Sequence, residues 1–282
     1  MKTGLVIEGG GVRGIYAAGV LDQLMEMGLA FDGVIGVSAG AIHGCSYLSE
    51  QKGRSIRYYK KYCADPRFMG FHSWLKTGDI VGADFCYHEL PDKLDVYDHA
   101  AFLRNPTPFY VVCSNVDTGE AEYIRLTDMQ SQIDYLRASA SLPYFSRLVE
   151  IDGKKYLDGG ATDSLPVDAF MNMGYERNVV ILTQHAGYRK SAEMGILPGL
   201  VYRKYPAFAK ALKKRHIRYN QTLDHIRQLE KEQKIFVIRP HAPLDIGRME
   251  KDPARVEQAY LMGVEDTVSQ KEALIHWFSA GK

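Results

Sequence analysis

The chain opens with two apolar runs, each followed by a short turn and a segment with helical periodicity. Residues 5–7 are predicted to form a buried strand, and an amphipathic helix follows to about residue 27, with apolar positions at 17, 20, 21 and 24. Residues 31–37 are predicted to form a second strand and residues 39–47 a second helix. Two strand–loop–helix units in succession indicate a parallel sheet with helices on its faces. We therefore expect an α/β fold.

The hydrophobic pattern after residue 50 predicts further strands and helices. Helices are predicted over residues 51–62, 128–140, 166–173 and 253–278, and strands over 108–116, 120–126, 148–151, 154–157, 178–183 and 235–238. Asp152-Gly153 is a strong two-residue hairpin signal between two of these strands. Residues 65–106 show no clear period, and we interpret them as an irregular connection with short helices that covers the site.

The composition restricts the class of protein. The formal net charge of +1 lacks the basic excess of a dedicated nucleic-acid binder. The four cysteines, none in a C-x-x-C pair, indicate free thiols in a reducing compartment, and no cluster of residues has metal-ligand spacing. The apolar run before Glu8 is too short for a secretory signal, and no run approaches the ~20 apolar residues of a membrane span. We expect a soluble, cytoplasmic protein without metal or cofactor.

Candidate chemistry begins with Gly36-Val37-Ser38-Ala39-Gly40, which lies between the second predicted strand and the second predicted helix. Strand, sharp turn and helix are the setting of a nucleophile elbow, in which the serine hydroxyl projects above the sheet. Glycine at the flanking positions avoids collisions with neighbouring backbone. Ser38 is therefore a candidate nucleophile. The alternative is a chance G-x-S-x-G sequence in a chain with 26 glycines.

A glycine-rich loop, Gly9-Gly10-Gly11-Val12-Arg13-Gly14, follows the first predicted strand and has the form G-x-G-x-x-G. A dinucleotide site would need an acidic residue at the end of the second strand, but Asp32 precedes that strand and Ser38 occupies its end. Neighbouring parallel strands end side by side, so the glycine N–H groups would face Ser38 and form an oxyanion hole. Arg13 would steady the loop or bind an anionic substrate group; the alternative is a solvated arginine.

A third candidate is Asp158-Gly159-Gly160, which follows the predicted hairpin. An aspartate at a strand end followed by two glycines is a loop carboxylate surrounded by backbone. A carboxylate close to a serine hydroxyl can take its proton and activate it. The alternative is an Asx turn.

The order and spacing of residues 9–14, 36–40 and 158–160 resemble the patatin-like phospholipase family, and the resemblance covers about residues 4–173. Ala138-Ser139-Ala140-Ser141-Leu142-Pro143 also resembles the family's segment ahead of its aspartate. The resemblance implies a three-layer α/β/α sandwich with a mostly parallel sheet and a Ser38–Asp158 dyad that hydrolyses acyl esters of lipids. It places the oxyanion hole in the backbone of Gly9, Gly10 and Gly11, with Arg13, Gly14, Gly36, Gly40, Gly159 and Gly160 as supporting motif residues.

The resemblance also implies how the chain is divided into domains. We expect one patatin-like domain over residues 1–282, with the catalytic motifs in 4–173 and a helical C-terminal extension around 196–282. Ile238-Arg239-Pro240 and Glu250-Lys251-Asp252-Pro253 look like the tail of bacterial members. The sequence does not determine the head group, the acyl chain length or the oligomeric state.

Two other functions stay open at this stage. The first is an α/β-hydrolase with a Ser-Asp-His triad, for which His185, after a predicted strand, is the best candidate. The second is a catalytically silent lipid-binding module that uses residues 202–218, which hold seven Lys and Arg and no acid. This segment is predicted to be an amphipathic helix that contacts an anionic membrane surface, with packing of its apolar side on the core as the alternative.

Overall fold

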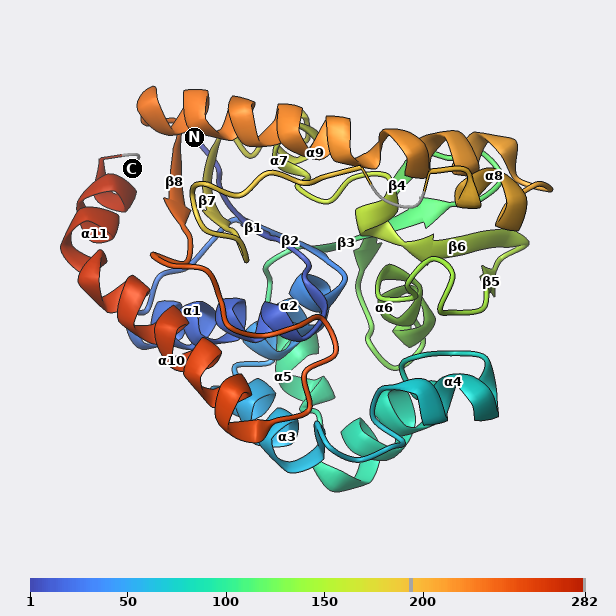
Figure 1. Cartoon of the computed structure of the whole chain (residues 1–282). Helices are drawn as coiled ribbons and strands as arrows, with labels where there is room; N and C mark the ends of the chain where they lie inside the picture. Colours follow the sequence, from blue (N-terminus) through green and yellow to red (C-terminus); the bar gives the residue numbers. More distant parts are fainter. Residues whose placement is uncertain (193–194, 281–282) are drawn as a thin grey trace.

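A central sheet carries the fold (Figure 1). In the computed structural model, which describes residues 1–192 and 195–280, the sheet has eight strands in the order β5-β6-β3-β2-β1-β7-β8, with β4 also paired to β3. The parallel strands are β1 (Thr3–Ile7), β2 (Gly33–Val37), β3 (Phe109–Asn115), β7 (Arg177–Ile181) and β8 (Ile235–Ile238). The antiparallel strands are β4 (Ala121–Leu126), β5 (Val149–Ile151) and β6 (Lys154–Asp158). The predicted mostly parallel sheet is confirmed.

Helices cover both faces of this sheet, which gives the predicted three layers (Figure 1). Leu5 and Ile7 pack into one apolar core with α1 (Ile15–Glu26) and α2 (Ala39–Leu48). Val6 belongs to a second core on the other face, with α7 (Val167–Asn172) and α9 (Pro206–Lys231). The alternation of strand side chains between faces therefore divides the interior into two cores.

The C-terminal segment packs onto the N-terminal helix. In α10 (Pro253–Ser269), Gly263 approaches α1 so closely that a Cβ would lie 2.1 Å from the Tyr16 carbonyl oxygen. The prediction of one helix over 253–278 is wrong, because the chain breaks into α10 and α11 (Lys271–Ser279). The Gln270 side chain donates to the Asp266 carbonyl at 2.9 Å and caps α10. The turn allows α11 to bury Phe278 against Phe31, with ring centroids 5.4 Å apart.

Two other predicted helices are shorter in the structure. The helix predicted over 51–62 is α3 (Arg54–Tyr62), which begins after Gly53 in the left-handed conformation. The helix predicted over 128–140 is α6 (Ile133–Ser139), because the Asp128 carboxylate accepts the N–H groups of Gln130 and Ser131 and forms a turn. Such local side-chain bonds compete with the helical pattern.

The irregular stretch over residues 65–106 contains short helices, as predicted. They are α4 (Phe71–Thr77), a π-helix (Phe85–Leu94) and α5 (His99–Arg104). Short 3₁₀ turns occur at Gly11–Gly14 and Gly159–Ala161.

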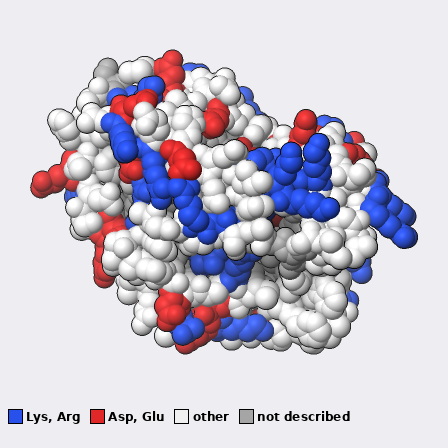
Figure 2. Space-filling model, turned by 45° about the horizontal axis from the view of Figure 1, so that its top comes forward, with Lys and Arg blue, Asp and Glu red and all other residues white. Residues whose placement is uncertain are grey.

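The basic segment is divided between the core and the surface. Tyr202 follows α8 (Leu197–Val201), and it is buried with Phe208 of α9, so the apolar side packs on the protein. Lys and Arg side chains gather over the end of the molecule where α9 begins (Figure 2). None of the described helices is long and apolar enough to cross a membrane.

Candidate active site

The sheet topology brings Ser38 and Asp158 together although 120 positions separate them. Val37, at the end of β2, is paired with Val112 of β3. Cys113, the next residue of β3, is paired with Asp158, at the end of the antiparallel strand β6. Two strands on opposite sides of β3 therefore deliver these residues to the same edge of the sheet.

Ser38 occupies a strained turn between β2 and α2. Its φ of 55° and ψ of −124° are a conformation that side-chain-bearing residues rarely adopt. The flanking glycines are required by space: a Cβ at Gly36 would lie 2.6 Å from the Ala41 Cα, and one at Gly40 would lie 2.4 Å from the Ile7 carbonyl oxygen. The turn thus has the geometry of a nucleophile elbow.

Ser139 holds this turn in place. Its hydroxyl accepts the Ser38 N–H at 3.0 Å and donates to the Val112 carbonyl oxygen at 2.7 Å. Ser139 is fully buried, so both bonds are shielded from water. Ser139 lies in the segment 138–143 that resembles the family, but the sequence alone did not indicate this role for it.

Asp158 accepts a hydrogen bond directly from Ser38. The Ser38 Oγ lies 2.7 Å from Oδ2, and the Gly160 N–H donates to Oδ1 at 2.7 Å. Asp158 is only 3% exposed and Ser38 7% exposed. Burial raises the pKa of the Asp158 carboxyl, while the hydrogen bond from Ser38 and the charge of Arg215 act in the opposite direction. A raised pKa makes the carboxylate a stronger base toward the serine hydroxyl.

The glycine-rich loop lies against Ser38. A Cβ at Gly9 would be 2.8 Å from the Ser38 Cβ, and Gly11 has a φ of +60° that places it against Arg248. The Gly9 carbonyl accepts from Thr183 Oγ1 at 2.9 Å, and the Val12 N–H donates to the Arg248 carbonyl at 3.0 Å. Within residues 1–192 and 195–280, the N–H groups of Gly10 and Gly11 donate no hydrogen bond. They are therefore available to a ligand.

Glu8 precedes the glycine-rich loop and anchors it through a buried carboxylate. No role was predicted for Glu8 from the sequence. Its buried carboxylate accepts from the Tyr219 hydroxyl at 2.5 Å and from the Thr183 N–H at 2.6 Å. Burial raises the pKa of Glu8, and these two donors oppose the shift. Because Tyr219 belongs to α9, no local signal near Glu8 could have indicated the contact.

The remaining predicted motif residues support the same framework. A Cβ at Gly14 would lie 2.5 Å from the Ala39 Cβ, and one at Gly159 would lie 2.1 Å from the Val112 carbonyl oxygen. Gly160 bonds to Asp158 through its N–H and accepts from the Arg215 Nε at 2.5 Å through its carbonyl. Arg13 is partly buried, and its Nε has no hydrogen-bond partner among the described residues.

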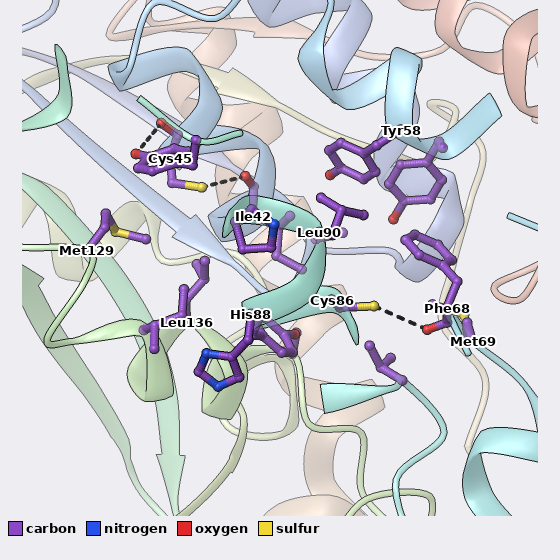
Figure 3. A pocket seen from close by; sticks show the side chains of 18 of the residues that line it. Ile42, Cys45, Tyr58, Phe68, Met69, Cys86, His88, Leu90, Met129 and Leu136 are labelled. Atoms are coloured by element: carbon purple, nitrogen blue, oxygen red, sulfur yellow. Dashed lines mark hydrogen bonds between the residues drawn. The ribbon is translucent and has the colours of Figure 1, made fainter. Parts of the chain in front are cut away.

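An apolar cavity of about 280 Å³ opens beside Ser38 (Figure 3). Its walls come from α2, α3, the π-helix and α6. Side chains that point into it include Ile42, Tyr58, Phe68, Leu90, Met129 and Leu136. Residues 65–106, for which the sequence showed no period, therefore form one wall of the site.

The predicted histidine does not join these groups. His185 Nδ1 accepts the Gly187 N–H at 3.2 Å, and its ring lies near Tyr188. Across the described part of the chain, no histidine nitrogen is bonded to Ser38 or Asp158. The same residues contain no group of His, Cys, Asp and Glu that could hold a metal ion.

Known proteins match this chain over part of their own length. The uncharacterized protein YjjU of Escherichia coli is 31% identical over 185 residues, which are 64% of this chain and 52% of that protein. The lysophospholipase nte1 of Aspergillus niger is 28% identical over 178 residues, which are 61% of this chain and 11% of that protein. The chain thus matches about half of one curated relative and about a tenth of the other.

The structural comparison found VipD from Legionella pneumophila. It is 13% identical with a TM-score of 0.47, and the alignment covers 96% of this chain and 67% of that chain.

Two family models match the sequence. One, a domain of unknown function, matches residues 205–279. The other, patatin-like phospholipase, matches residues 5–171 and contains Ser38, Asp158 and the glycine loop. Because this second match covers more than half of the chain and includes the motifs that the fold brings together, the chain belongs to the patatin-like phospholipase family.

Proposed function

We propose that this protein is a serine hydrolase that cleaves acyl esters of lipids with a dyad of Ser38 and Asp158. The observation that carries the proposal is the 2.7 Å hydrogen bond from the Ser38 Oγ to the buried Asp158 carboxylate. An unassisted serine hydroxyl is a weak nucleophile, and an adjacent general base activates it. No imidazole is needed between the two groups because they are already in contact.

The reaction follows from this contact in two stages. Asp158 takes the Ser38 proton as Oγ attacks the ester carbonyl, and it returns that proton to the alcohol oxygen when the ester C–O bond breaks. A water molecule then gives a proton to Asp158 and attacks the carbonyl of the acyl-enzyme. Asp158 passes this proton to the Ser38 Oγ as the acyl C–Oγ bond breaks, which releases the fatty acid and restores both residues. The same carboxyl serves as base and acid in both stages.

The glycine loop supplies the electrostatic part of the mechanism. The N–H groups of Gly10 and Gly11 carry no hydrogen bond among the described residues, and the loop lies against Ser38. Backbone donors that are fixed before the reaction stabilise the oxyanion without reorganisation. We assign the oxyanion hole to this backbone, with Gly9 as the residue that allows the close approach.

The apolar cavity supports a lipid acyl chain as the group transferred to Ser38. Its volume of about 280 Å³ is just below the usual range for ligand pockets, which favours one chain over two. The relative named a lysophospholipase is consistent with a substrate that carries a single chain. The exposed lysines near the start of α9 support peripheral contact with an anionic membrane.

The test combines labelling with product analysis. Purified protein is treated with a fluorophosphonate probe and, separately, with a panel of neutral esters, acylglycerols and phospholipids whose products are identified by mass spectrometry. We expect the probe to label Ser38 and fatty acid to be released, and both to be lost in Ser38→Ala. A folded wild-type protein that is neither labelled nor active would instead support the silent lipid-binding module.

The triad alternative is tested with the same assay. His185→Ala, and each other single His→Ala variant, should keep most of the activity because, among the residues that the structure describes, no imidazole is hydrogen-bonded to Ser38 or Asp158. A folded His→Ala variant as inactive as Ser38→Ala would show that the dyad is wrong.

A further inference from the structure

A second pocket, of about 50 Å³, lies beside Ser38 and is lined by four basic side chains. They come from distant parts of the chain: Arg13, Lys190, Arg215 and Arg248. This pocket and the apolar cavity share Gly11, Ser38, Leu142 and Arg248, so both of them border the nucleophile. Ser38 therefore lines one mainly apolar cavity and one cationic pocket.

Lys190 is the most unusual of these cations because it is only 7% exposed. Its backbone N–H donates to the Asn220 Oδ1 at 2.9 Å, and its carbonyl accepts from the Asn220 Nδ2 at 2.9 Å. The Nζ lies 4.5 Å from the centroid of the Tyr219 ring. The two backbone bonds fix the main chain of Lys190, and its low exposure restricts the positions that the charged end can take before a ligand binds.

The arginines belong to other segments that line the pocket. The side chain of Arg215 is fixed by its Nε bond to the Gly160 carbonyl, and the backbone of Arg248 is held at the glycine loop by the Val12 N–H that its carbonyl accepts. Burial lowers the pKa of Arg13, and the charge of Arg248 lowers it further. Two like charges held this close repel each other, and a bound anion would relieve the repulsion.

The acidic groups that face the pocket are Glu8 and Asp158. Both carboxylates also interact electrostatically with the basic side chains: Glu8 with Arg13 and Lys190, and Asp158 with Arg215 and Arg248. The lining of the pocket therefore holds four basic and two acidic side chains, an excess of positive charge. Arg and Lys arranged around a small enclosed space suit phosphate, which accepts charge-assisted hydrogen bonds from several sides.

We propose that Arg13, Lys190, Arg215 and Arg248 form a subsite for a phosphate group on the leaving alcohol of the ester, so that the preferred substrates are monoacyl lipids with a compact anionic phosphate. This inference rests on the proposed function, since it takes Ser38 as the nucleophile. With the acyl chain in the apolar cavity, the ester oxygen points toward the cationic pocket. The small volume of this pocket suits a single phosphate group and excludes a second acyl chain.

The experiment compares two esters with the same acyl chain: a 1-acylglycerol 3-phosphate and the corresponding neutral 1-acylglycerol. The readout is the ratio of kcat/KM for the phosphate ester to kcat/KM for the neutral ester. We expect this ratio to exceed one in the wild type and to fall roughly tenfold or more in Lys190→Gln and in Arg248→Gln, because each loses a charge-assisted contact. Lys190→Arg should restore part of the ratio.

Matched controls separate this effect from net charge and from the proposed function. Lys271→Gln removes one exposed positive charge on α11, away from the pocket, and should leave the ratio as in the wild type. If the wild type cleaves both esters equally and neither pocket variant changes the ratio, the proposed phosphate subsite is wrong, but the proposed hydrolase function still holds. If Ser38→Ala cleaves the neutral ester as the wild type does, the proposed function itself fails.

Ligand binding provides a second test of the subsite that does not depend on catalysis. We expect sn-glycerol 3-phosphate, but not glycerol, to bind the full chain in calorimetry and to inhibit cleavage of the neutral ester competitively, and both effects should be lost in Lys190→Gln. Absence of binding would overturn the subsite. Inorganic phosphate that binds more tightly than glycerol 3-phosphate, without a preference for the phosphate ester, would mark a free-anion site and overturn its assignment to the leaving alcohol.

Discussion

The two cavities beside Ser38 differ in chemistry and in origin. The apolar cavity is lined mainly by residues between Ser38 and Leu142, whereas the cationic pocket takes Lys190, Arg215 and Arg248 from the part of the chain after Asp158. The same glycine loop borders both, since Gly11 lines each of them. An ester that reacts at Ser38 is therefore expected to meet an apolar wall on its acyl side and fixed positive charge on its alcohol side.

This difference indicates how the two ends of a substrate are selected. Burial of an apolar chain is non-directional and scales with area, so the acyl side should tolerate chains of varied length up to the size of the cavity. Recognition by fixed charges depends on sign and position, so the alcohol side should discriminate more sharply. Lys190, Arg215 and Arg248 also lie outside the residues matched by the patatin-like model. We therefore expect alcohol preference to depend on the C-terminal part of this chain.

The largest effect is expected from a change in the catalytic dyad, which both cavities border. Asp158→Asn keeps the shape of the side chain but removes the base, and activity on every ester should fall by roughly 10²–10⁴-fold. The loss in the double variant with Ser38→Ala should not exceed that of Ser38→Ala alone, because the two residues act as one unit. Since burial disfavours the ionised carboxyl, the melting temperature at neutral pH should stay equal or rise. Retained activity in the folded variant would contradict the dyad.

The pH profile tests the same carboxylate without mutation. Only ionised Asp158 can accept the Ser38 proton, and burial raises its pKa above the ordinary value. The kcat/KM for a neutral ester should therefore fall by about tenfold per pH unit below that raised pKa and stay level above it. This direction follows because protonation removes the base. A profile that rises toward acid would show that Asp158 acts in its protonated form.

A smaller loss of activity is expected from a substitution in the glycine loop, which borders both cavities. In Gly10→Val, the Cβ would lie 2.9 Å from the Thr183 Oγ1, so the loop must shift and its N–H groups move away from the oxyanion. Loss of one such donor costs about 3 kcal/mol of barrier, or roughly 10²–10³-fold in kcat. The same loss should occur with neutral and phosphate esters, because both form the same oxyanion. Wild-type turnover by a folded Gly10→Val protein would exclude this backbone as the oxyanion hole.

The acyl side alone is tested by filling the apolar cavity. Ile42 lines it one helical turn after Ser38, and Ile42→Trp would shorten the space available to the chain. Each methylene that no longer fits costs about 0.8 kcal/mol, so excluding two should cost about tenfold in kcat/KM for a long chain. Short-chain esters should be little affected, and Ile42→Ala is the matched control that enlarges the cavity. An equal loss for short and long chains would mean that the chain lies elsewhere.

The smallest effect on turnover is expected at the basic surface of α9. Lys210, Lys213 and Lys214 are exposed there, and changing all three to Gln should weaken binding to anionic vesicles, most clearly at low salt. Turnover of a soluble short-chain ester should change by no more than about twofold, within the range of surface substitutions. Arg215 is left intact because it bonds to Gly160. Vesicle sedimentation that is unchanged in the triple variant would refute membrane contact by this surface.

The sequence by itself determined the parts of this protein that depend on local backbone requirements. The alternation of strand and helix over the first fifty residues predicted a parallel sheet, because each element must bury its own apolar face. Gly36, Gly40 and the glycines at 9–11 were informative for a similar reason, since a side chain at those positions would collide with backbone, with Ser38 or, at Gly10, with Thr183. The order of the three motifs was enough to suggest the family.

Only the tertiary structure decided which distant groups meet. Several hydrogen bonds of the site join elements that are distant in the sequence: Ser139 with Ser38, Tyr219 with Glu8, Arg215 with Gly160, and Arg248 with the glycine loop. The periodicity of a sequence carries no information about such contacts. The same reason explains the wrong boundaries: Gln270 ends α10 through a side-chain bond, and Asp128 forms a turn where the pattern predicts a helix. The cationic pocket is the clearest case, because its four basic residues are scattered along the chain. They become one site only when α9 and the segments after β7 and β8 pack beside the glycine loop.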